Sequence, residues 1–180
     1  LFDGEFSALP KLETLFSGKT NLTNATLKGD FSSVGSLKDL FLNCSSLTSA
    51  TLDANFTSLT NLQSTFNGCS ALPTVTLKGD FSNVSTTQSM FNNCKSLTSA
   101  TLDGDFGAAL TSMRYMFGAC ELLESVSFTS EGDDADVSVK GDFSGVTTMQ
   151  DLFNGGCSNL KNVTLAENFS SLTNIGSLFA

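Results

Sequence analysis

Phenylalanine recurs along this chain at a fixed interval, and no other feature of the sequence constrains the fold as strongly. The first five markers, Phe6 to Phe106, are evenly spaced, and the interval then widens before Phe143 and again slightly before Phe169. A second phenylalanine follows most markers by ten positions, and a third column is mainly leucine. A period of about 25 residues lies in the range that is typical of stacked structural repeats. The columns are Phe6, Phe31, Phe56, Phe81, Phe106, Phe143 and Phe169; Phe16, Phe41, Phe66, Phe91, Phe117, Phe153 and Phe179; and Phe2, Leu27, Leu52, Leu77, Leu102, Phe128 and Leu165.

The wide interval between Phe106 and Phe143 indicates an insertion. One extra residue lies within residues 107–110, and the rest lies near the stretch TSEGDDADVSV at residues 129–139. Both SVSF at residues 125–128 and VSVK at residues 137–140 fit the strand position of this repeat, so the placement stays open. We expect one array over residues 1–180, interrupted by an inserted acidic loop at residues 129–139.

Each repeat has two halves with different apolar spacing. In the second repeat, positions 34, 37, 40, 41 and 44 are apolar, which is helical spacing and predicts one or two turns of α- or 3₁₀-helix. Positions 50 and 52 then alternate with polar residues, which predicts a short strand with one buried face. Because the period is regular, equivalent strands should lie side by side as a parallel sheet.

The strand half carries a motif that resembles leucine-rich repeat proteins. The stretches LTSATLDAN at 47–55 and LKNVTLAEN at 160–168 match L-x-x-L-x-L-x-x-N. In that family the final Asn turns inward, whereas Asp30, Asp80, Asp105 and Asp142 replace it here and should lie nearer solvent. The expected fold is α/β: a right-handed leucine-rich-repeat-like solenoid of about seven coils, with a parallel sheet on one face and short helical turns on the other.

A narrower resemblance rests on the string M-F-x-x-C-x-x-L. It occurs as MFNNCKSL at 90–97 and MFGACELL at 116–123, with LFLNCSSL at 40–47 as a close variant. These segments look like the BspA-type leucine-rich repeat surface proteins. The resemblance implies an extracellular or cell-surface location and a role in adhesion to host or bacterial surfaces. Lys19 departs from the pattern, because related repeats have cysteine at that position.

Alternation along each strand predicts which side chains face solvent. The outer positions include four threonines and a column in which Lys and Asp alternate from one repeat to the next. Opposite charges on adjacent strands stabilise each other, so the column partly neutralises itself. The face is a candidate partner-binding surface, and a solvated sheet is the alternative. Its residues are Thr26, Lys28, Thr51, Asp53, Thr76, Lys78, Thr101 and Asp103.

A second candidate site lies around the insertion. Arg114 and Tyr115 are the only Arg and the only Tyr of the chain, and these residue types are enriched in binding hot spots. The acidic loop carries Glu131, Asp133, Asp134 and Asp136, whose carboxylates could bind Ca²⁺. Because their spacing does not match the calcium-loop motif, we expect a solvated contact loop and no metal site.

Composition excludes several classes of function. The formal net charge of −9 does not attract nucleic acid, and no apolar run approaches the length of a membrane span. Histidine is absent, which excludes Ser-His-Asp and Cys-His catalytic sets and His-ligated zinc. We therefore expect no enzyme activity and no cofactor.

Five cysteines occupy one position of the repeat: Cys44, Cys69, Cys94, Cys120 and Cys157. Their spacing matches neither a metal site nor a redox motif. A free cysteine behaves as a small buried apolar residue, so this column is expected to be inert.

Three functions remain open from the sequence. The first is a protein–protein adhesion module that contacts a host matrix or cell-surface protein. The second is a structural spacer, and the third is a glycan-binding accessory module, which would require exposed aromatic rings. Neither end of the chain carries a cap, so we also expect a piece of a longer array or end-to-end self-association through strand edges.

Overall fold

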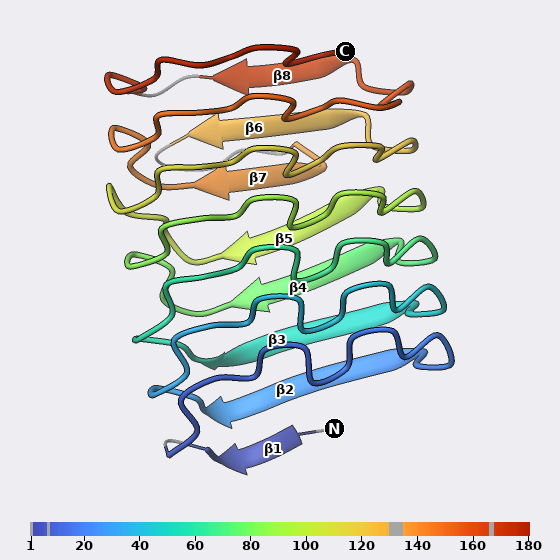
Figure 1. The fold of residues 1–180 in the computed structure, drawn as a ribbon, viewed down its shortest axis with the longest axis vertical. Coiled ribbons are helices and arrows are strands. Elements are labelled where there is room, and N and C mark those ends of the chain that lie inside the picture. The colour runs from blue at the N-terminus through green and yellow to red at the C-terminus, as the bar shows by residue number, and fades with distance from the viewer. Residues whose placement is uncertain (1, 7, 130–134, 166–167) are drawn as a thin grey trace.

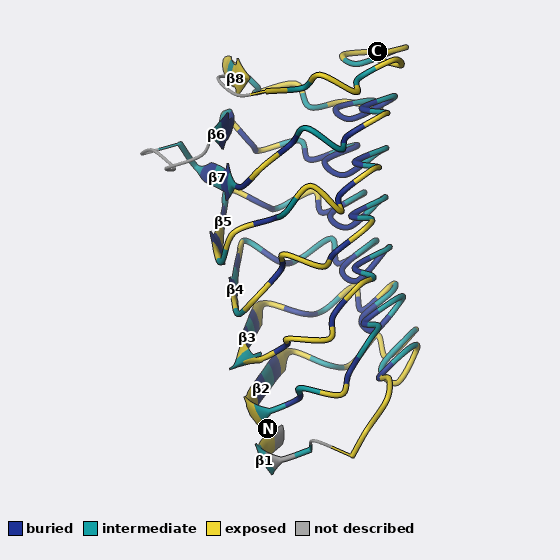
Figure 2. Ribbon diagram, turned by 90° about the vertical axis from the view of Figure 1, so that its left-hand side faces the viewer, coloured by how far each residue is buried: buried dark blue, intermediate teal, exposed yellow. Residues whose placement is uncertain are grey.

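The fold is a stack of parallel strands with a column of turns beside it. The computed structural model describes residues 2–6, 8–129, 135–165 and 168–180. In these residues eight strands form one parallel sheet along the long axis of the molecule (Figure 1). The strands are β1 (Phe2–Glu5), β2 (Asn24–Asp30), β3 (Ser49–Asn55), β4 (Thr74–Lys78), β5 (Ser99–Asp103), β6 (Ser125–Thr129), β7 (Val137–Lys140) and β8 (Asn162–Leu165). Turn segments between the strands form the second column (Figure 2), which gives a solenoid-like repeat.

The sequence period is the register of the sheet. Leu27 lies beside Leu52, Leu52 beside Leu77, and Leu77 beside Leu102, so residues one period apart are neighbours on adjacent strands. Each of these leucines is at most 3% exposed, since alternate strand residues face the core. The predicted leucine column and parallel pairing are confirmed.

The expected helical turns are wrong for the residues that the structure describes, which contain no helix. Consecutive β-turns occupy these segments instead. The Leu40 N–H donates to the Leu37 carbonyl three residues earlier, but the Phe41 N–H donates to Thr65 in the next repeat. Asp39 has a φ of 57°, which is incompatible with a right-handed helix. The apolar spacing is misleading because successive β-turns also return a side chain to the core every three or four residues.

Stacked phenylalanine rings fill the core between the turns and the sheet. The ring of Phe66 lies between those of Phe41 and Phe91, with centroid distances of 5.4 and 5.7 Å. All three side chains are 0% exposed. Offset stacking at this spacing is a favourable arrangement of aromatic rings, so the phenylalanine period builds a continuous column.

Hydroxyl side chains join neighbouring repeats at the bends. Thr60 Oγ1 donates to the Gly35 carbonyl at 2.9 Å, and Ser85 Oγ donates to the Thr60 carbonyl at 3.0 Å. The series continues one repeat at a time through Thr111, Thr147 and Thr173. Much of the Ser and Thr content therefore satisfies backbone carbonyls between repeats.

Aspartates at the end of the strands form local turns. Oδ1 of Asp80 accepts the Ser82 N–H at 2.9 Å, and Asp30 and Asp142 accept equivalent bonds. Hydrogen bonds from the hydroxyl and N–H of Ser82 lower the pKa of Asp80. Asp80, Asp105 and Asp142 are exposed, as predicted, and a side chain that only accepts a bond suffices here.

The insertion changes the order of the sheet. Both stretches that fit the strand position are strands, and the order is β5-β7-β6-β8. Strand β7 pairs with β5 on one side and with β6 on the other, although β6 precedes it in the chain. The turn segments keep their chain order, because Phe91 donates to Met116 and Phe117 donates to Leu152. The inserted residues thus add a strand to the sheet alone.

Candidate interaction surface

The outer face of the sheet carries the threonines that the sequence places there. Thr26, Thr51, Thr76 and Thr101 follow one another in register across β2 to β5, and each is half-buried or exposed. The alanine and valine residues that precede them are buried. The predicted orientation of these strands is confirmed, and the four residues form one continuous outer column.

The charged column also follows the predicted register. Lys28 lies beside Asp53, Asp53 beside Lys78, and Lys78 beside Asp103. Among the described residues, only the last of these three steps forms an ion pair, with 3.6 Å between Lys78 Nζ and Asp103 Oδ2. Exposed pairs of this kind stabilise a protein by roughly 0–1 kcal/mol. Lys28 and Asp53 are exposed and keep their charges available to another molecule.

Lys140 extends this column, and the sequence analysis misses it. Ser138 lies beside Thr101 in the β5–β7 pairing, so Lys140 comes level with Asp103. Its Nζ lies 3.5 Å from Oδ1 of Asp105. The insertion hides the residue, because Lys140 follows Asp103 by much more than one regular period. The signal is the VSVK stretch, once that stretch is assigned to a strand.

The acidic loop supplies one described carboxylate, and this group is already bonded. Oδ2 of Asp136 accepts the Ser125 N–H at 2.9 Å and the Ser125 hydroxyl at 3.0 Å. Asp136 therefore fixes the start of β7 beside the start of β6. Glu131, Asp133 and Asp134 lie outside the described residues. Within the described ranges, no group of three His, Cys, Asp or Glu side chains is placed to hold a metal ion.

Arg114 and Tyr115 lie in the turn segment between β5 and β6, outside the strands of the sheet. The Arg114 guanidinium lies 4.9 Å from the Tyr115 ring centroid, and Nη2 lies 3.4 Å from Oδ2 of Asp151. Asn154 donates to Oδ1 of the same carboxylate at 2.9 Å. The hydrogen bond from Asn154 lowers the pKa of Asp151 most, and weaker contributions come from hydrogen bonds with Tyr115 and Arg114. These contacts join two turn segments, and they are separate from the sheet-face residues.

The cysteine column has a structural role that spacing alone does not reveal. Each thiol donates to the carbonyl of a phenylalanine in the preceding repeat, as Cys94 does to Phe66 at 3.1 Å. Burial raises the pKa of Cys69 to about 12, and burial also raises the pKa of Cys94 well above its usual range. Lys19 occupies the equivalent position of the first turn segment, and its side chain is exposed. The equivalent bonds are Cys44 to Phe16, Cys69 to Phe41, Cys120 to Phe91 and Cys157 to Phe117.

Thiol reactivity should follow this burial. At neutral pH we expect an aromatic disulfide reagent to modify Cys157 first, because Cys157 is only partly buried and only the thiolate reacts. Cys69, Cys94 and Cys120 should react only after denaturant is added. The release of chromophore over time measures both phases, and Cys157→Ser should remove the fast one. Equal rates for all five thiols in the native chain would contradict the buried column.

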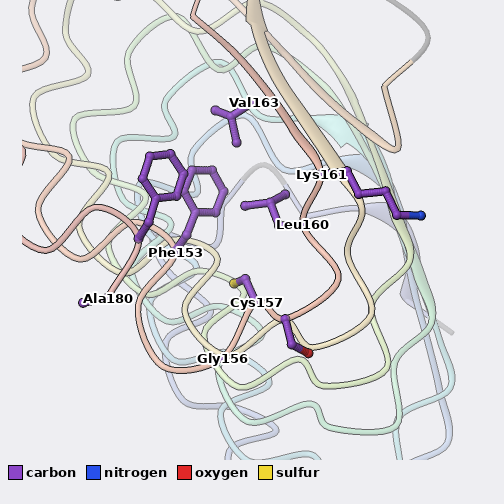
Figure 3. A pocket seen from close by; sticks show the side chains of 9 residues that line it. Phe153, Gly156, Cys157, Leu160, Lys161, Val163 and Ala180 are labelled. Atoms are coloured by element: carbon purple, nitrogen blue, oxygen red, sulfur yellow. The ribbon is translucent and has the colours of Figure 1, made fainter.

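The described surface includes a groove and a smaller hollow. A groove of about 530 Å³ lies at the C-terminal end of the stack, where Phe153, Cys157, Leu160 and Val163 surround an open space (Figure 3). A smaller hollow of about 410 Å³ lies at the bend that contains Asp105, Asp142 and Asn168. The groove at the C-terminal end is lined mainly by apolar side chains. The smaller hollow lies where the repeat spacing is irregular.

No helix in the described part of the chain has the length and apolar character that a membrane span requires.

Comparison with known proteins gives one family. The sequence profile of the family described as "Mycoplasma protein of unknown function, DUF285" matches residues 10–130, which are more than half of the chain. No curated protein and no solved structure matches this chain.

Proposed function

The chain belongs to the family described as Mycoplasma protein of unknown function, DUF285, and from the architecture of this member we propose that it is a non-catalytic module that binds another protein. The observation that carries the proposal is the outer face of β2 to β5, where half-buried and exposed polar side chains recur in register on one sheet. Extended faces of stacked repeats commonly bind partners. The absence of histidine from the sequence agrees with a role outside acid–base catalysis.

The proposed partner is a protein on a cell or matrix surface. The M-F-x-x-C-x-x-L strings resemble BspA-type surface proteins, and that resemblance supports an extracellular location and adhesion to host or bacterial proteins. It also supports a right-handed sense for the repeat array, and the phenylalanine markers of the sequence support about seven coils. Lys28 and Asp53 would contribute to binding most, because they are exposed and form no ion pair with each other.

A structural spacer is the second candidate, and one observation favours it. Lys78 pairs with Asp103, and Lys140 pairs with Asp105, so part of the face is already neutralised within the chain. Glycan binding is less well supported, because the phenylalanine rings of the interior repeats are buried and sugar sites need exposed rings.

The test of the binding module is a charge swap on the sheet face. The double variant Lys28→Asp, Asp53→Lys keeps the net charge and exchanges the positions of the positive and the negative side chain on β2 and β3. We expect it to weaken saturable binding to matrix proteins or epithelial cells by about tenfold or more, which corresponds to about 1.4 kcal/mol. Binding would be measured by surface plasmon resonance and on whole cells.

The matched control exchanges an exposed pair elsewhere. Lys95 Nζ and Glu121 Oε1 lie 2.8 Å apart at the bends between repeats. The double variant Lys95→Glu, Glu121→Lys should leave binding unchanged. If the folded native chain binds none of the matrix proteins and no epithelial cells, the spacer function is favoured. If both double variants bind as the native chain does, the sheet face is not the site.

A further inference from the structure

A column of charged side chains runs along the outer face of the sheet and changes sign at every strand. Asp3 of β1 lies beside Lys28, and the alternation continues through β3, β4 and β5. The β5–β7 pairing brings Lys140 level with Asp103, so Lys140 extends the pattern. On β6 the neutral Thr129 lies beside Lys140. In sheet order, the charged column is Asp3, Lys28, Asp53, Lys78, Asp103 and Lys140.

The charged column has no net charge of its own, although the whole chain has a net charge of −9. Its members are exposed, apart from Lys140, which is half-buried. A face with equal numbers of both signs does not select a partner of one sign. It fits a partner that presents the inverse alternation, at the spacing of about 4.8 Å that separates neighbouring strands.

The charged column read in reverse order supplies this inverse alternation. Two copies can face each other about a two-fold axis that is parallel to the strands and lies between β3 and β4. The strand order of one sheet is then the reverse of the strand order opposite it. Each charge of the column therefore meets the opposite charge, and each pair occurs twice. The opposed pairs are Lys28 with Asp103, Asp53 with Lys78, and Asp3 with Lys140 of the second copy.

Other ways of facing the same two columns are less favourable. A two-fold axis along the charged column itself would keep the strand order, so that Lys28 would oppose Lys28 of the second copy. Like charges placed opposite each other destabilise a contact. In the reversed arrangement, a shift by one strand also opposes like charges. A shift by two strands restores opposite charges but leaves two members of the described column without a partner on each copy.

We propose that the outer face of β1 to β5 and β7 binds the same face of a second copy of this chain, in a symmetric dimer whose two-fold axis lies between β3 and β4. A symmetric contact closes at two copies, because each copy uses the same surface. Six strands about 4.8 Å apart, with about five residues each, cover roughly 400–500 Å² per copy. Stable interfaces bury about 800 Å² per partner, so the dimer should be weak.

The dimer goes beyond the adhesion function proposed above and does not depend on it. Lys28 and Asp53 belong to both surfaces, so a second copy would compete with a matrix or cell-surface protein for the same face. Dissociation of the dimer would then precede adhesion. The dimer is tested with the chain alone, and its outcome is independent of whether any matrix protein binds.

The test is sedimentation velocity of the full chain and of two charge-swap variants, at micromolar to millimolar concentrations. The first variant is Lys28→Asp, Asp53→Lys, and the second is Lys78→Asp, Asp103→Lys. Both keep the net charge of the native chain. We expect the native chain to form dimers and nothing larger. Each variant alone should dimerise at least tenfold more weakly, because the swap places like charges opposite each other in all four central pairs.

Mixing the two variants tests the register of the contact. The two swaps together restore opposite charges at every position, so the mixture should form a heterodimer of about native affinity. Circular dichroism would verify that both variants keep the native sheet signal. The control Lys95→Glu, Glu121→Lys exchanges an ion pair at the bends and should dimerise as the native chain does.

Three results would overturn the proposal. The first is a native chain that stays monomeric at every concentration. The second is a sheet-face swap variant that dimerises alone as strongly as the native chain, which would place the contact elsewhere or in another register. The third is a mixture of the two variants that stays monomeric, which would mean that the opposed charges do not determine the contact.

Discussion

Phe66→Ala is expected to lower the free energy of unfolding by about 3–5 kcal/mol, the usual cost of truncating a buried phenylalanine. The side chain is 0% exposed, and its ring stacks on Phe41 and Phe91. Removing it leaves a cavity that two neighbouring repeats must share, since each repeat packs only on its neighbours. Thermal unfolding followed by circular dichroism would show a fall in Tm on the order of 10 °C.

The matched control lies in the same column. Phe179 is 63% exposed, and among the described residues its ring stacks on that of Phe153 alone, at 5.5 Å between centroids. Phe179→Ala should therefore cost less than half as much. Both variants would be compared at the same protein concentration. Equal losses at the two positions would mean that the stacked rings of the interior carry no special share of the stability.

Gly145→Ala is expected to cost about 1–3 kcal/mol, which is typical of overpacking a well-packed interior. A Cβ built on Gly145 would collide with the backbone carbonyl of Ala108 in the preceding repeat. Ala108 belongs to the stretch that contains one extra residue, so the glycine makes room for that bulge. Urea unfolding would measure the loss as a lower midpoint with an unchanged slope.

Two controls test whether the collision with Ala108 causes the loss of stability, or whether any glycine-to-alanine substitution would: one at a second glycine, and one a deletion. A Cβ on Gly35 would lie 3.7 Å from the Ser58 carbonyl, an ordinary contact, and Gly35→Ala should be nearly neutral. Deleting Ala108 together with Gly145→Ala should recover most of the loss, because the bulge is gone. If Gly35→Ala and Gly145→Ala unfold at the same midpoint, the close approach at Ala108 does not limit packing.

The spacing of the apolar residues was sufficient to predict the sheet. Apolar positions that recur once in every repeat can be buried together only if they lie side by side, and Leu27, Leu52 and Leu77 do so. The outward threonines and the alternating charges followed from strand alternation alone. The sheet pairing and the outward positions depend on one regular period, and that period recurs in most repeats of the sequence.

The remaining features depend on which partner each backbone group finds. The turn segments have helical spacing, but residues such as Asp39 adopt a left-handed conformation, because half of the N–H groups bond to the next repeat. The role of the cysteines required the position of a carbonyl one repeat away, as for Cys94 and Phe66. Lys140 lay outside the period, because the position of the insertion was ambiguous in sequence.

The sheet order at the insertion determines the order in which the strands of this protein can form. In the described sheet, β6 pairs only with β7 and β8, and both follow it in the chain. Strands β1 to β5 can therefore form as each is synthesised, but β6 has no partner until residue 140 is available. A gap for β7 must stay open beside β5 during that time. Zipper-like growth, which is usual for repeat arrays, should pause here, and the strands on either side of β7 should behave as two kinetically distinct folding units.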